Sequence, residues 1–143
     1  MSHYDLEKNL VPLEELSKQK EYTNLVRTVL EARFSDSPKA FIHTYGCQGN
    51  VSDGERIKGL LSECGFSMTD ELSEADLVLY NTCAVREHAQ DRVFGNVGAL
   101  KKYKTLNKNM KICLCGCMVQ QAHVIQRWTC PSCRLQRYLL WSF

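Results

Sequence analysis

Three features are missing from the sequence: a strong surplus of charge, a long apolar segment and a leader peptide. The formal net charge is only +2, and nucleic-acid-binding domains are usually more basic, so overall charge does not argue for RNA or DNA. No apolar run approaches the roughly 18 residues of a membrane-spanning helix. The opening MSHYDLEKNL lacks the basic and apolar regions of a signal peptide. We therefore expect a cytoplasmic monomer, without a membrane or DNA partner, whose 143 residues form one compact domain.

Cysteine, in contrast, is abundant. The eight cysteines are Cys47, Cys64, Cys83, Cys113, Cys115, Cys117, Cys130 and Cys133. Structural disulfides are rare in a reducing cytosol, so this enrichment favours metal binding or thiol chemistry. The alternative is that some of these cysteines are small, buried apolar residues. Both interpretations are expected to hold, for different cysteines.

A strand–loop–helix unit occurs three times, after a polar start and an amphipathic helix predicted over 13–34. The predicted strands cover residues 40–44, 76–80 and 111–115, and the helices cover 53–64, 85–106 and 118–127. A minor strand is expected near 66–68. Ser52 and Glu55 have the spacing of a capping box at the start of the first of these helices. The units predict an α/β fold in three layers, a mainly parallel flavodoxin-like or Rossmann-like sheet with helices on both faces.

Cys47, Cys83 and Cys117 occupy the strand-to-helix loop of the first, second and third unit, respectively. In parallel sheets these loops all emerge at the carboxyl edge, where ligands bind. The three cysteines are separated by 36 and 34 positions, about the length of one βαβ step. We therefore expect the three thiols to meet at one edge of the sheet.

Three convergent thiolates suit zinc, copper(I) or an iron–sulfur cluster. Structural zinc usually takes four protein ligands, often in two close pairs, whereas each loop here supplies one cysteine and no obvious histidine. A 4Fe–4S cluster with three cysteine ligands would leave one iron open to water, substrate or a sulfur species. Glycines beside the cysteines (Gly46, Gly49 and Gly116) fit a backbone that passes close to a bulky cluster. The alternative is three unrelated buried thiols.

Four segments around these cysteines carry a resemblance to a known family. They are Thr44–Arg56, Asn81–Glu87, Asp91–Asn96 and Cys115–Gln121. In this order and spacing, within about residues 38–127, they resemble the N-terminal domain of the methylthiotransferases, and most of all the tRNA-modifying MiaB-type branch. Gly49 and Gly54 depart from the family pattern, which commonly has Met and Ser there.

The resemblance implies that Cys47, Cys83 and Cys117 ligate an auxiliary 4Fe–4S cluster that supplies or carries sulfur. Full-length members also have a radical S-adenosylmethionine domain, whose Cys-x-x-x-Cys-x-x-Cys motif holds a second 4Fe–4S cluster. They add a methylthio group to isopentenyladenosine next to the anticodon of tRNA, their partner. S-adenosylmethionine supplies both the methyl group and the radical initiator in that family.

The sequence contains no Cys-x-x-x-Cys-x-x-Cys motif. Because the resemblance covers about 38–127 and breaks after Arg127, we expect residues 1–37 to be an extension and helix, 38–127 the auxiliary cluster domain, and 128–143 a tail without family resemblance, from truncation or a frameshift. Whether the chain alone is an enzyme stays open, and no methylthio transfer is expected from it alone. The alternative function is a non-catalytic module that binds an iron–sulfur cluster or zinc.

The remaining cysteines are interpreted separately. Cys113 and Cys115 alternate within a predicted strand and are expected to be packed, and Cys64 is interpreted as a core or surface thiol. The lone pair Cys130 and Cys133 is interpreted as adventitious. We also expect three main strands with one edge of the sheet bare, which would favour association. The lysines near the end of the helix predicted over 85–106 are either simply solvated or in contact with tRNA phosphates.

Overall fold

The computed structural model describes residues 12–83, 89–121 and 138–141. The helices are α1 (Leu13–Arg33), α2 (Gln48–Glu63) and α3 (Ala89–Leu106), with short 3₁₀ turns η2 (Leu72–Glu74) and η3 (Cys117–Gln120). The strands are β1 (Lys39–Thr44), β2 (Ser67–Met68), β3 (Leu77–Thr82), β4 (Lys111–Gly116) and β5 (Tyr138–Trp141). They form one sheet in the order β2-β1-β3-β4-β5, and every pairing is parallel.

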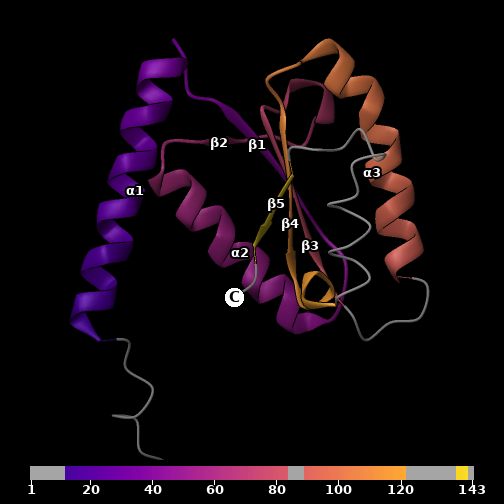
Figure 1. Ribbon diagram of the computed structural model, residues 1–143, viewed down its shortest axis with the longest axis horizontal. Helices are drawn as coiled ribbons and strands as arrows, with labels where there is room; N and C mark the ends of the chain where they lie inside the picture. Colours follow the sequence, from indigo (N-terminus) through magenta and orange to yellow (C-terminus); the bar gives the residue numbers. More distant parts are fainter. Residues whose placement is uncertain (1–11, 84–88, 122–137, 142–143) are drawn as a thin grey trace, which may run out of the picture.

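Helices cover both faces of the sheet, as predicted (Figure 1). On one face α2 packs on an apolar cluster that includes Ala40, Ile57 and Leu79. On the other face Val93, Val97 and Leu100 belong to the larger apolar cluster. All six residues of β3 are buried, as expected for a central parallel strand covered on both faces. The prediction of a three-layer, parallel α/β fold is confirmed.

Helix α1 forms where the sequence predicts it, but none of its residues is buried within the described structure. It lies outside α2 (Figure 1), and Arg27 donates a hydrogen bond to the Glu63 carbonyl at the end of that helix. Leu25 and Val29 remain 59% and 45% exposed. None of the described helices is both long and apolar enough to cross a membrane.

The start predicted for the second helix is wrong. Helix α2 begins at Gln48, five residues earlier than expected, and the residue that precedes its first turn is Cys47. Cys47 and Asn50 provide the capping box, so Ser52 and Glu55 lie inside the helix. The amide oxygen of Asn50 accepts the backbone N–H of Cys47 at 3.3 Å, which satisfies a group that a helix end otherwise leaves unpaired.

Two other expectations need correction. The sequence predicts a last helix over 118–127, but η3 is a 3₁₀ turn that ends at Gln120, and residues 122–127 lie outside the described part. The sheet edge beside β4 is not bare, because β5 pairs with β4 from Ile112↔Tyr138 to Cys115↔Trp141. The apolar residues at the end of the chain thus supply a fifth strand, and the backbone groups on that side of β4 are paired.

Candidate functional site

The three cysteine-bearing loops start from one edge of the sheet. Strand register pairs Thr44 with Asn81 and Thr82 with Gly116, so β1, β3 and β4 end side by side. Cys83 and Cys117 each follow a paired residue directly, and Cys47 follows the end of β1 by three positions. In Figure 1 this edge lies at the bottom, where α2 begins and η3 is seen. The predicted convergence of the loops at the carboxyl edge of the sheet is therefore present.

The Cys47 loop touches the Cys83 loop through Gly46. This glycine has a φ of 149°, and a Cβ atom placed on it would lie 2.7 Å from the Cβ of Cys83. No real side chain fits at such a distance. A glycine at position 46 therefore lets the backbone before Cys47 pass directly against Cys83.

The backbone at Gly116, directly before Cys117, lies close against the end of β3. This residue has φ 90° and ψ −173°, a conformation essentially restricted to glycine. A Cβ atom on Gly116 would collide with the carbonyl oxygen of Thr82 and lie 2.8 Å from Oδ1 of Asn81. The backbone that leads into Cys117 can approach β3 this closely only without a side chain.

Two buried asparagines connect these loops, and the sequence interpretation gave them no role. Asn50 and Asn81 are 6% and 1% exposed. The side chain of Asn50 donates to Oδ1 of Asn81 at 3.4 Å and to the carbonyl oxygen of Thr82 at 3.3 Å. The side chain of Asn81 donates to the Asn50 carbonyl oxygen at 2.8 Å. Both residues lie within the segments that carry the family resemblance, but their burial becomes visible only in the folded chain.

The three thiols differ in exposure. Cys47 and Cys117 are exposed, whereas Cys83 is buried, with 3% of its surface accessible. In the part of the chain that the structure describes, no three His, Cys, Asp or Glu side chains lie close enough to hold a metal ion. The fold thus brings the three loops together, but it does not bring three described side chains to the spacing that a single metal ion needs. In donor type and in loop placement, three thiols at one edge fit a soft-metal or iron–sulfur centre.

The other described cysteines lie elsewhere. Cys113 and Cys115 are buried in β4 within the apolar cluster beneath α2, as the alternating pattern predicted. Burial raises the pKa of Cys115 to about 12, with smaller contributions from Cys113 and Asp53. Cys64 lies at the end of α2, where desolvation also raises its pKa. Cys130 and Cys133 fall outside the described residues.

This arrangement predicts which thiols of the reduced, metal-free chain react. At pH about 8, iodoacetamide should modify the exposed Cys47 and Cys117 at least about tenfold faster than Cys113 and Cys115, which react only after local opening. Peptide mass mapping over time measures the four rates. The same reaction in concentrated urea is the control, because unfolding should make the rates similar. Equal rates in the native chain would contradict the placement of Cys113 and Cys115.

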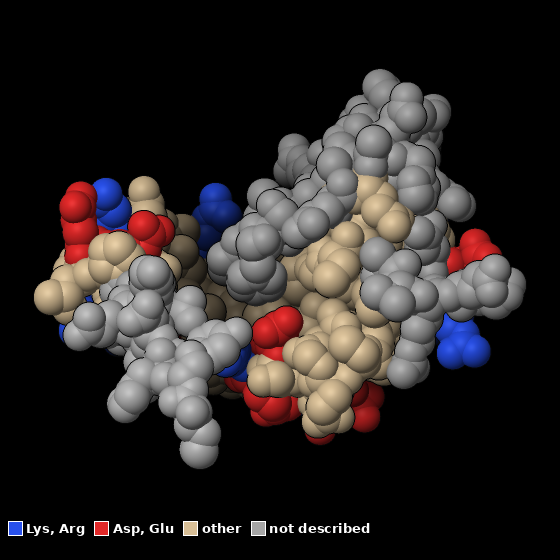
Figure 2. Space-filling view, turned by 90° about the horizontal axis from the view of Figure 1, so that it is seen from below, with Lys and Arg blue, Asp and Glu red and all other residues tan. Residues whose placement is uncertain are grey.

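The described residues form no broad basic patch on the face that carries the cysteine edge (Figure 2). Figure 2 views the molecule from this side, and its described atoms are mainly uncharged. Lys101, Lys102 and Lys104 are at the end of α3, and Lys111 begins β4, so they lie toward the opposite edge of the sheet (Figure 1). Lys104 donates to the Met110 carbonyl oxygen at 2.5 Å. A nucleic-acid contact through these lysines would therefore be far from the cysteine edge.

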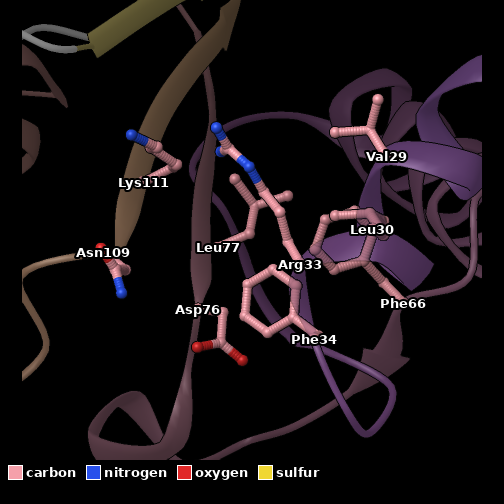
Figure 3. A pocket seen from close by; sticks show the side chains of 9 residues that line it. All are labelled: Val29, Leu30, Arg33, Phe34, Phe66, Asp76, Leu77, Asn109 and Lys111. Atoms are coloured by element: carbon pink, nitrogen blue, oxygen red, sulfur yellow. The ribbon is translucent and has the colours of Figure 1, made fainter.

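A cavity of about 440 Å³ also lies at this opposite edge. Its lining includes Val29, Leu30 and Phe34 from α1 or its end, and Leu77 and Lys111 from the starts of β3 and β4 (Figure 3). None of the described cysteines lines it. The cavity and the three-cysteine edge are therefore separate features of the domain.

Comparison with known proteins adds independent information. The model described as "Uncharacterized protein family UPF0004" matches residues 39–128. The chain is 42% identical over 119 residues, 81% of its length, to the tRNA-2-methylthio-N(6)-dimethylallyladenosine synthase of Clostridioides difficile (strain 630). Proteins of the same name from Caldicellulosiruptor saccharolyticus and Clostridium beijerinckii are 52% and 50% identical over 60% and 61% of the chain. These alignments cover 25%, 18% and 19% of the three relatives, so the chain spans a quarter or less of each.

Proposed function

This chain belongs to the family described as uncharacterized protein family UPF0004, and we propose that it is the auxiliary iron–sulfur domain of a tRNA methylthiotransferase. The observation that carries the proposal is the meeting of the Cys47, Cys83 and Cys117 loops at one edge of a parallel sheet. The similarity to synthases named for a 2-methylthio-adenosine in tRNA supports it. Residues 38–127 would form the domain, in agreement with the family match over 39–128.

Cys47, Cys83 and Cys117 would be the ligands of a 4Fe–4S cluster. Thiolates are the usual protein ligands of such clusters, and the other cysteines of β4, Cys113 and Cys115, are buried in the apolar cluster under α2 rather than placed in a loop. A bound cluster would supply or carry the sulfur for the reaction. Within the chain, the exposed Cys47 and Cys117 would keep this centre open to a partner domain or substrate, while the buried Cys83 would fix it to β3.

The whole enzyme would modify tRNA in the cytoplasm, adding a methylthio group to an isopentenyladenosine next to the anticodon. The S-adenosylmethionine site and the second cluster of that reaction are assigned to no residue here, because the sequence has no Cys-x-x-x-Cys-x-x-Cys motif. The second candidate function is a non-catalytic module, which would bind the cluster or zinc without turnover.

A chimera tests the proposal and separates it from the second candidate. Residues 39–121 would replace the matching segment of the Clostridioides difficile synthase, in a strain that lacks its own synthase. We expect the chimera to restore the 2-methylthio nucleoside in tRNA, measured by mass spectrometry of digested tRNA. The same chimera with Cys83→Ala should give at least about a hundredfold less product, because removal of a ligand should cost more than the roughly 10–100-fold that loss of a ligand's hydrogen-bonded neighbour brings.

The chimera gives two further informative results. A folded chimera that binds about eight irons, enough for both clusters of the family, but makes no product would favour the non-catalytic module. Equal product from the parent chimera and its Cys83→Ala variant would contradict the assignment of Cys83 as a cluster ligand.

A further inference from the structure

Asn50 and Asn81 are buried polar groups at the cysteine edge, with 6% and 1% of their surface exposed. Burial of an amide is unfavourable unless its donors and acceptors are paired. Both side chains find partners, and every partner belongs to the loops and strand ends that carry the cysteines. Through their hydrogen bonds the two asparagines therefore connect the cysteine-bearing loops with one another, in addition to filling space in the core.

Asn50 joins the first two cysteine loops. Its Oδ1 accepts the backbone N–H of Cys47 at 3.3 Å and lies 3.3 Å from the Cys47 Sγ. Its Nδ2 donates to two groups at the end of β3, Oδ1 of Asn81 and the carbonyl oxygen of Thr82, the residue before Cys83. One planar side chain thus holds the start of α2 at a fixed separation from the end of β3.

Asn81 extends the connection toward the third loop. Its Nδ2 returns a hydrogen bond to the Asn50 carbonyl oxygen at 2.8 Å, so the two asparagines bind each other reciprocally. Its Oδ1 faces the backbone at Gly116, where only 2.8 Å would separate it from an added Cβ. The neighbouring Thr82 donates its hydroxyl hydrogen to the Cys115 carbonyl oxygen at 2.6 Å, two residues before Cys117.

We propose that Asn50 and Asn81 are positioning residues that set the separation of the three cysteine-bearing loops and thereby determine how tightly the chain holds an iron–sulfur cluster. The proposal rests on the proposed function, since it concerns the same centre. Neither residue is a ligand. They act through the backbone around Cys47, Cys83 and Cys117, as hydrogen-bonded neighbours of metal ligands generally do.

The Asn50→Asp variant separates this role from helix capping. Aspartate keeps an oxygen that can accept the Cys47 N–H, and a negative charge in the first turn of α2 is favourable to the helix. It lacks the amide hydrogens that reach Asn81 and Thr82, and places a carboxylate against their oxygens. The helix should therefore persist while the connection between the loops is lost, and the uncharged Asn81→Ala variant separates this loss from the effect of a new carboxylate near the Cys47 Sγ.

Asn107→Asp is the matched control. Asn107 also donates its amide hydrogens to two oxygens, the carbonyl of Ala75 and Oδ1 of Asp76, and its Oδ1 accepts the backbone N–H groups of Asn109 and Met110. It lies at the opposite edge of the sheet, where β3 and β4 begin. The same chemical change there lowers stability without touching the cysteine loops.

The experiment uses the full chain, reconstituted with iron and sulfide without oxygen, and follows release of iron to a chelator. Far-UV circular dichroism confirms folding of each variant. Asn50→Asp and Asn81→Ala should each release iron at least about tenfold faster than the parent chain, whereas Asn107→Asp should not. The Asn50→Asp, Asn81→Ala double variant should release iron hardly faster than the faster single variant, because both changes break one shared connection.

The outcomes separate the positioning role from the proposed function. A parent chain that takes up no iron overturns the proposed function and this proposal with it. A parent chain that holds iron, with folded Asn50→Asp and Asn81→Ala variants that release it at the parent rate, overturns the positioning role alone. Equal acceleration by Asn107→Asp also overturns it, since general destabilisation would then be the cause. The two ends of the connection are tested separately, so one variant that fails to fold does not remove the test.

Discussion

Replacement of Cys47, Cys83 and Cys117 together by alanine is expected to abolish the uptake of iron and sulfide by the chain. The three loops that carry these residues meet at the carboxyl edge of the sheet, and a cluster cannot be held there without thiolate ligands. Under anaerobic reconstitution the parent chain should take up about four irons and about four sulfides, and the triple variant less than about one of each. Iron and sulfide assays on the desalted protein measure both.

The matched control removes three thiols from other positions. Cys64 lies at the end of α2, and Cys113 and Cys115 are buried in β4 under that helix rather than in a loop. Their joint replacement by alanine should lower stability, because two of them are buried, but leave the iron content of the folded protein unchanged. If the variant without Cys47, Cys83 and Cys117 retained iron, the proposed assignment of the ligands would be wrong. It would also be wrong if a folded variant without Cys64, Cys113 and Cys115 lost its iron.

Gly116→Ala is expected to destabilise the domain severely, by roughly 3 kcal/mol or more. The backbone at Gly116 has φ 90° and ψ −173°, which only glycine adopts readily. The added methyl group would also collide with the carbonyl oxygen of Thr82 on the neighbouring strand. Relief of that collision would separate the ends of β3 and β4, so the Cys117 loop would move away from the Cys83 loop. Urea unfolding followed by circular dichroism measures the change in unfolding free energy.

Gly98→Ala is the control for this substitution. Gly98 lies within α3, and an added Cβ there would meet no atom within 4 Å. Since alanine has the higher helix propensity, this variant should be more stable than the parent, by up to about 1 kcal/mol. A Gly116→Ala variant as stable as the Gly98→Ala variant would show that the backbone at Gly116 is not confined to the conformation that only glycine adopts readily.

The parallel sheet and the meeting of the cysteine loops could be predicted because both follow from repetition along the chain. Three apolar segments, each followed by a polar loop and a helical pattern, allow few arrangements other than parallel strands with crossovers. Which of the cysteines lie in the loops could then be predicted from their places directly after the predicted strands. Each of Cys47, Cys83 and Cys117 follows the last residues of a strand.

The start of α2 could not be predicted from the same patterns. Ser52 and Glu55 match a common capping box, while Cys47 and Asn50, which provide the observed one, are residue types seldom associated with that role. The choice depends on Asn50, whose amide is held by Asn81 and Thr82. Those residues are about 30 positions away in the sequence, so the local pattern contains no sign of them.

The fifth strand was missed because short apolar segments near the end of a chain do not reveal whether a sheet edge will accept them. Tyr138–Trp141 pairs in parallel with β4. From the sequence, these residues are assigned to a tail without family resemblance, and the edge of the sheet is expected to be bare. Pairing of β5 with β4 satisfies backbone groups that an edge strand would otherwise expose.

Metal and acid-labile sulfide analysis of the unaltered chain, purified without oxygen from iron-replete cells, tests the three-cysteine centre most directly. We expect about four irons and about four sulfides per chain, with zinc well below one. Stoichiometric zinc without sulfide, or a folded chain that holds no metal even after reconstitution, would contradict a cluster at Cys47, Cys83 and Cys117.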